Sequence, residues 1–214
     1  RGRWRDRELE MGERRGRSVP AKQGRGTLAK GEHAPPSLPL IMGHEGVGRV
    51  VALGPNASRL KIGDRVGIGY VYAACGHCRD CLTGGENYCP DFDATGYSVQ
   101  GCFAEYVCLR DQWANKIPNE ITPIEAAPLM CAGAAAYASI KKTGVQTGDT
   151  VAIFGMGGLG QYAVQIAKLM GLRVIAVDIS TNKLATAESL GADERVIAND
   201  QAGENITALG GAHG

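Results

Sequence analysis

The sequence has no cysteine before Cys75 and no apolar run that approaches the ~20 residues a membrane-spanning helix needs. Its first residues, Arg-Gly-Arg-Trp-Arg-Asp, lack the apolar segment of a secretory signal. Four of the seven cysteines fall between Cys75 and Cys89. We therefore expect a cytoplasmic protein without a membrane partner, in which the clustered thiols bind metal instead of forming disulfides.

Residues 1–27 show no apolar periodicity, and we expect no regular element there. Residues 1–37 carry ten Lys and Arg against five Asp and Glu, whereas residues 38–214 carry thirteen against seventeen. A basic segment of this kind can be a nucleic-acid arm, but the body is acidic and no aromatic and basic stripe accompanies the cysteines. The interspersed acidic residues argue against a transit peptide. The preferred interpretation is a disordered basic tail over residues 1–27, with no nucleic-acid partner.

Short apolar runs broken by glycine turns fill the segment from residue 38 to about residue 109. Strands are expected around Gly48–Leu53, within residues 60–72 and over Cys102–Leu109. This succession predicts a compact β-rich domain.

Beyond Pro118 the pattern becomes helical and then alternates between short apolar runs and helical segments. Two Ala-rich helices are expected over Pro123–Met130 and Ala132–Lys142. The expected elements that follow are strand Thr150–Phe154, helix Leu159–Met170, strand Arg173–Val177, helix Thr181–Leu190 and strand Arg195–Ile197. This βαβαβ order is typical of a parallel α/β sheet, which normally has two or three further strands.

Four cysteines follow the spacing Cys75-x2-Cys78-x2-Cys81-x7-Cys89. Four thiolates this close in sequence can complete a tetrahedral shell, and soft sulfur ligands favour zinc over hard cations. Because protein fills all four positions, the predicted site is structural. The alternative is a set of buried or redox-active thiols, which so regular a spacing disfavours.

The glycine pattern Gly155-x-Gly157-x-x-Gly160 lies between an apolar strand and an apolar helix, and Asp178 lies 18 residues beyond its last glycine. In this context the glycines make a tight turn that brings the backbone close to a pyrophosphate at the helix N-terminus. Asp178 is expected to accept hydrogen bonds from ribose hydroxyls and to repel a 2′-phosphate, which favours NAD over NADP. A glycine turn without a nucleotide is the alternative. The predicted cofactor-binding residues are Gly155, Gly157, Gly158, Leu159, Gly160, Asp178 and Lys183.

A third, sparser set consists of His44, Glu45 and Cys131. An imidazole, a carboxylate and a thiol are a plausible partial shell for an open zinc site. Taken singly, each is more often an ordinary turn or core residue.

Six stretches together resemble the zinc-containing medium-chain alcohol dehydrogenases. They occur in family order between about residues 38 and 193: LPLIMGHEGVGRVVALG, IGDRVGIG, ACGHCRDCLTGGENYC, GYSVQGCFAEYV, APLMCAGAAAYASIKKTG and VAIFGMGGLGQYAVQIAKLMGLRVIAVD. The resemblance implies a GroES-like catalytic domain over residues 28–131 and an incomplete NAD-binding Rossmann domain over residues 132–214. It also implies hydride transfer between a small alcohol or aldehyde and NAD.

The resemblance assigns His44 and Cys131 as ligands of a catalytic zinc, with Glu45 beside them, and the four clustered cysteines as ligands of a structural zinc. The family's first catalytic ligand, a cysteine in a Cys-His-Thr/Ser-Asp stretch, is expected near residues 22–25, where this sequence has Lys-Gln-Gly-Arg. The family's usual dimer-forming edge would lie beyond Gly214. We therefore expect a chain incomplete at both ends and weakly active or inactive, or else a non-catalytic relic that binds zinc and nucleotide.

Overall fold

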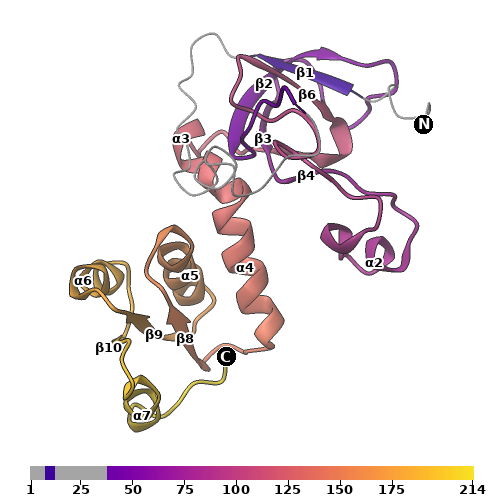
Figure 1. The fold of residues 1–214 in the computed structure, drawn as a ribbon. Coiled ribbons are helices and arrows are strands. Elements are labelled where there is room, and N and C mark those ends of the chain that lie inside the picture. The colour runs from indigo at the N-terminus through magenta and orange to yellow at the C-terminus, as the bar shows by residue number, and fades with distance from the viewer. Residues whose placement is uncertain (1–7, 13–37) are drawn as a thin grey trace. The chain divides into compact units, whose positions relative to one another are not determined.

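The computed structural model of the chain describes residues 8–12 and 38–214 (Figure 1). These residues belong to two compact units, Arg1–Cys131 and Ala132–Gly214. Within the described ranges, no helix has the length and apolar character that crossing a bilayer requires.

The first unit is built on a five-stranded antiparallel sheet with the order β6-β1-β2-β3-β7. Its strands are β1 (Glu8–Gly12), β2 (Gly46–Leu53), β3 (Arg65–Ile68), β6 (Tyr106–Arg110) and β7 (Ala114–Lys116). Residues of β2 alternate between buried and more exposed positions, because successive side chains point to opposite faces of a sheet. The core of this unit comprises Val50, Leu60, Val66, Ile68, Cys102, Leu109 and Ala114.

Strand β1 corrects the prediction that residues 1–27 contain no regular element. It lies between β2 and β6, with Leu9 opposite both Leu53 and Leu109. The local sequence, ELEMG, offers an alternating pattern over only four residues. Pairing with two strands that are distant in sequence therefore specifies this strand more than its own pattern does.

Two further expectations in this unit are wrong. Residues 102–105 are not part of a strand, because the backbone N–H groups of Cys102 and Phe103 donate to the carbonyls of Gly43 and Met42 in a loop. The helix expected over Pro123–Met130 is two short elements, α3 (Pro123–Ala126) and the 3₁₀ helix η4 (Ala127–Met130). Pro128 has no N–H to donate, so the α-helical ladder cannot continue through it.

The four clustered cysteines lie in a small lobe between β3 and β6, which we call the four-cysteine lobe. It opens and closes on a two-stranded pair, β4 (Val71–Ala73) and β5 (Asp93–Ala94). Between them lie the helix α2 (Arg79–Leu82) and the 3₁₀ helix η2 (Glu86–Tyr88). After β6, a 3₁₀ turn η3 (Asp111–Trp113) leads to β7.

The second unit holds a three-stranded parallel sheet with the order β10-β9-β8. The strands are β8 (Thr150–Phe154), β9 (Arg173–Asp178) and β10 (Glu194–Ile197). The helices are α4 (Ala132–Thr143), α5 (Gly158–Leu169), α6 (Thr181–Ser189) and α7 (Ala202–Ala208). The predicted fold class, a GroES-like β-rich part followed by a Rossmann-like α/β part, is confirmed. Helix α7 was not predicted.

Helices cover both faces of this sheet (Figure 1). Val174 and Ala176 of β9 face the cluster formed with α4, α5 and α6, whereas Ile175 and Val177 face the cluster formed with α7. All four side chains are 0–1% exposed. Strand β9 is therefore a continuous apolar run, as a parallel strand covered on both faces requires.

Candidate functional site

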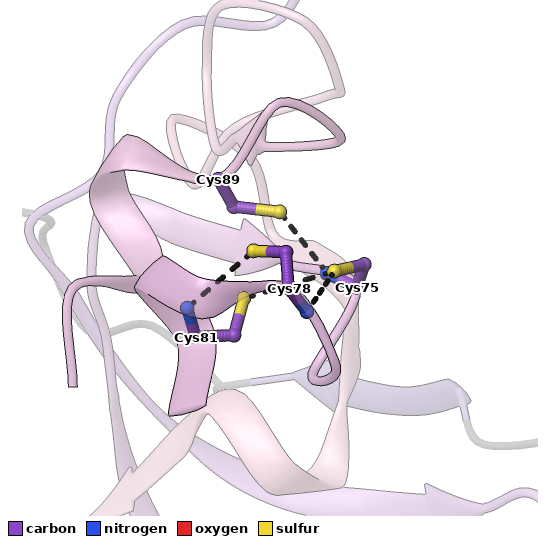
Figure 2. Close-up of side chains that lie close together, drawn as sticks. All are labelled: Cys75, Cys78, Cys81 and Cys89. Atoms are coloured by element: carbon purple, nitrogen blue, oxygen red, sulfur yellow. Dashed lines mark hydrogen bonds between the residues drawn. The ribbon is translucent and has the colours of Figure 1, made fainter. Parts of the chain in front are cut away.

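The four-cysteine lobe brings the four clustered thiols together (Figure 2). Cys78 caps α2, where its sulfur accepts the N–H of Cys81. The N–H of Cys75 donates to the Cys89 sulfur at 3.3 Å, and that of Cys78 donates to the Cys75 sulfur at 3.2 Å. Glycine makes the turn after the first cysteine possible, because Gly76 has a φ of +77°.

The spacing of these sulfurs fits a tetrahedral metal. All four Sγ atoms lie within 4.8 Å of one another, and those of Cys75 and Cys81 are 3.9 Å apart. A tetrahedron with Zn–S bonds of ~2.3 Å has sulfurs ~3.8 Å apart. Among the residues that the structure describes, these four are the one group of three or more candidate ligands gathered this closely. The thiol-only donor set fits zinc.

The four thiols are in unequal electrostatic surroundings. Backbone N–H groups, that of His77 first, lower the pKa of Cys75 to about 6. Burial raises the pKa of Cys81 to about 12. A bound cation must displace protons from such thiols, so metal binding by this lobe releases protons.

The glycine-rich turn joins β8 to α5 in the second unit. Gly155 has a φ of +87°, and a side chain at Gly160 would overlap the Gly155 carbonyl oxygen. Gly157 caps α5 without a side-chain hydrogen bond. The cap residue therefore leaves the first-turn N–H groups, including those of Gly158 and Leu159, without a side-chain acceptor. A Cβ at Gly155 would meet open space. This turn can accept a pyrophosphate at the helix N-terminus.

Asp178, the last residue of β9, holds this turn in place. Its Oδ2 accepts the N–H of Met156 at 2.6 Å, and its Oδ1 accepts the N–H of Ser180 at 2.9 Å. These two hydrogen bonds, followed by the charge of Lys183, lower the pKa of the carboxyl group. Asp178 is 5% exposed and Lys183, with its Nζ 3.7 Å away, is 53% exposed. Beyond these bonds, Oδ2 faces Lys183, and the carboxylate keeps further lone pairs that can accept hydrogen bonds.

His44 and Cys131 meet in the first unit although 87 residues separate them. The His44 Nε2 lies 3.3 Å from the Cys131 Sγ. Burial lowers the pKa of His44, and burial together with the charge of Glu45 raises the pKa of Cys131. Glu45 is buried, at 8% exposed, but it does not join the pair in a group of three candidate ligands. Residues 22–25, where the further ligand was expected, lie outside the described residues.

Two aromatic side chains that were not predicted from the sequence lie beside His44 and next to one another. The Tyr70 ring stands edge-on to the imidazole at 4.9 Å between centroids, and Phe92 lies 5.6 Å beyond Tyr70. Burial raises the pKa of Tyr70. No local pattern marks Tyr70, since it lies inside an apolar run that continues through Ala74; only the fold brings it to the pair.

The amino-acid sequence matches two protein families over most of its described length. Residues 22–119 match the family described as the alcohol dehydrogenase GroES-like domain, and residues 158–214 match the family described as zinc-binding dehydrogenase. An alcohol dehydrogenase of Geobacillus stearothermophilus is 52% identical over 158 residues, which is 74% of this chain and 47% of that protein. One of Moraxella sp. (strain TAE123) is 49% identical over 181 residues, 84% of this chain and 54% of that protein.

The chain belongs to the zinc-containing medium-chain alcohol dehydrogenase family. Solved structures of the family agree in fold. An NAD-dependent alcohol dehydrogenase superposes with a TM-score of 0.83 at 32% identity, covering 95% of this chain and 59% of that one. A cinnamyl alcohol dehydrogenase from Sorghum bicolor gives 0.80 at 30% identity, covering 92% and 58%. The chain spans about half the length of the curated relatives it matches.

Proposed function

We propose that this chain provides the zinc-binding and NAD-binding parts of an alcohol dehydrogenase that transfers hydride between a primary or secondary alcohol and NAD. The observation that carries the proposal is the contact between His44 and Cys131. It places an imidazole and a thiol 3.3 Å apart at the two positions where the family resemblance expects ligands of the catalytic zinc. The relatives named alcohol dehydrogenase support the same reaction class.

Cys75, Cys78, Cys81 and Cys89 would hold a structural zinc, because their sulfurs have the spacing of a tetrahedral shell. That ion would stabilise the segment between β4 and β5, because it would cross-link four of its residues. All four positions of the shell would be filled by protein, so none is left for a substrate. Its chemistry is therefore structural, not catalytic.

The glycine-rich turn and Asp178 would hold NAD, which accepts the hydride when bound. Backbone N–H groups at the start of α5 would face the pyrophosphate, and Gly155 leaves room for its approach. Asp178 would accept hydrogen bonds from ribose hydroxyls through its remaining lone pairs, and Lys183 would balance part of the carboxylate charge.

A second candidate function is a non-catalytic protein that binds zinc and nucleotide. One observation favours it: the described residues bring only two candidate ligands, His44 and Cys131, into direct contact at the catalytic position. An open catalytic zinc normally has three protein ligands. The described residues therefore do not complete that shell.

An assay of NADH formation from ethanol and longer primary alcohols distinguishes the two functions, with NAD binding measured separately by calorimetry. Turnover that is lost in His44→Ala, with NAD binding kept, supports the dehydrogenase. Zinc and NAD binding without turnover, unchanged by His44→Ala, contradicts it and supports the second function.

We further propose a cytoplasmic setting and a small alcohol or aldehyde as the substrate. All seven cysteines, which lie in the described part of the chain, are unbridged thiols, as a reducing compartment favours. Oligomerisation, which the family resemblance implies, stays a prediction.

A further inference from the structure

Two glycines at the end of β3 make room for the side chain and backbone of Met130. A Cβ at Gly67 would overlap the Met130 Sδ and would lie 2.9 Å from its Cγ. A Cβ at Gly69 would lie 3.3 Å from the Met130 carbonyl oxygen. Met130 is therefore seated in a notch that exists only because both positions lack a side chain. We call Gly67 and Gly69 the glycine notch.

Met130 directly precedes Cys131, so the position of Met130 determines where the backbone of Cys131 lies and from where its thiol extends. It ends η4, which contacts both β2 and β3. The preceding helix α3 starts with a capping box, in which Thr122 and Glu125 satisfy each other's backbone N–H groups. The segment is thus fixed at its start by the capping box and at its end by the glycine notch.

The imidazole is fixed by a separate set of contacts. Strand β2 begins at Gly46, which pairs with Ile68 of β3. His44 precedes β2 by two residues and therefore lies near the end of β3 that carries the glycine notch. Gly43 has a φ of +99°, and a side chain there would overlap the Phe103 ring. The contact between His44 and Cys131 therefore depends on two independently held segments, joined through β3.

We propose that Met130, seated in the glycine notch, is the positioning residue that holds the Cys131 thiol against the His44 imidazole. The positioning is a property of the protein itself. Only its use, which is to present two ligands to one metal, rests on the function proposed above.

The test follows the cross-peak in proton NMR between the His44 ring and the Cys131 β-protons, in the full chain with zinc supplied to the four-cysteine lobe. We expect the cross-peak in the parent chain and its loss in Gly67→Ala, because the new methyl group displaces Met130. Met130→Ala should weaken it as well. Adding Gly67→Ala to Met130→Ala should weaken the cross-peak little further, because the Met130 atoms that overlap the new Cβ are gone and only the end of the Ile117 side chain, at 3.0 Å, stays close to it. Gly203→Ala, whose Cβ meets open space, is the matched control and should leave the cross-peak unchanged.

A cross-peak that survives in Gly67→Ala overturns the proposal. Should that variant fail to fold, judged by its circular dichroism and by the zinc content of the lobe, an unchanged cross-peak in Met130→Ala overturns it instead. Titration with Co²⁺ separates this proposal from the proposed function. If the NMR pattern holds but the parent shows no thiolate-to-cobalt absorption beyond the zinc-filled lobe, the metal role of the pair fails and the positioning role stands. If both hold, Gly67→Ala should weaken Co²⁺ binding at least tenfold.

Discussion

The carboxylate of Asp178 accepts a 2.6 Å hydrogen bond from the backbone N–H of Met156, 22 residues earlier in the chain. This contact ties the end of β9 to the glycine-rich turn after β8. The residue expected to select the cofactor therefore also shapes the turn that would bind its pyrophosphate.

Asp178→Gly should remove any preference for NAD over NADP, because the negative charge that repels a 2′-phosphate is gone. It should also weaken the binding of both dinucleotides, since the N–H of Met156 loses its acceptor. Calorimetric titration of the parent and variant with each cofactor measures both effects. Asp200→Asn, at an exposed position outside the glycine-rich turn, is the control and should leave both affinities unchanged. Equal affinity of the parent for NAD and NADP would falsify the assignment.

Acid stability should depend on the same carboxyl group. Its pKa in the folded chain is lowered, so it stabilises the fold fully above the ordinary aspartate pKa of about 4 and progressively loses this effect as the pH falls through the folded value. The free energy of unfolding of the parent should therefore fall more steeply below pH about 4 than that of Asp178→Asn. Urea unfolding at a series of pH values gives both slopes. Asp200→Asn, at an exposed position, should follow the parent; parallel curves for Asp178→Asn and the parent would contradict this prediction.

The chain should hold one zinc per molecule through mild chelation, because the described residues gather a single four-ligand group. Cys89→Ser should lose that zinc, since it removes a ligand that is 5% exposed within the group. Cys108→Ser, at an exposed cysteine outside the group, should retain it. Elemental analysis of the dialysed proteins decides the matter. Two zinc ions in the parent chain would show that His44 and Cys131 hold one without the expected cysteine.

Replacing residues 22–25 with Cys-His-Thr-Asp should raise the zinc content from one to two per chain. The change supplies the thiolate that the family resemblance expects alongside His44 and Cys131, completing a three-ligand open shell. The same replacement in a His44→Ala background should leave one zinc, which serves as the control. A content of one zinc in both would contradict the expectation that a cysteine in this segment completes the shell of His44 and Cys131.

Leu172→Ala should destabilise the second unit by about 2–5 kcal/mol, the usual cost of emptying a leucine site in a core. Its side chain is 2% exposed and packs in the cluster of α4, α5 and α6. Leu169→Ala, three residues earlier and 88% exposed, should change the free energy of unfolding by no more than about 0.5 kcal/mol. Thermal or urea unfolding compares the two, and similar losses would mean that this core is wrongly assigned.

The second unit was largely predictable because each of its elements carries its own signal. Strand β8 has the predicted bounds, and β9 and α6 differ from prediction by one residue each. Helix α7 was missed because its sequence, AGENITA, contains glycine, asparagine and threonine, which are weak helix formers. Strand β1 was missed because the strands that pair with it are distant in sequence.

The candidate sites divide in the same way. Four cysteines within fifteen residues can be recognised in the sequence, as can the glycine pattern with Asp178. The contacts of Tyr70 with His44 and of Met130 with Gly67 could not be recognised, because they arise from the register of β2 on β3 and from the path of η4. The candidate ligand-binding residues were predictable because they follow sequence patterns, whereas the side chains that pack around them were not.

The short span of the four clustered cysteines has a consequence for how the chain assembles during synthesis. Closing a loop costs more conformational entropy as the loop grows, and contacts between distant residues form more slowly. Cys75 and Cys89 are separated by 14 residues, and His44 and Cys131 by 87. If the four clustered cysteines bind zinc as proposed, they could do so as soon as Cys89 has left the ribosome. Cys131 is synthesised some forty residues after Cys89, so the contact between His44 and Cys131 would form after the four clustered cysteines have come together.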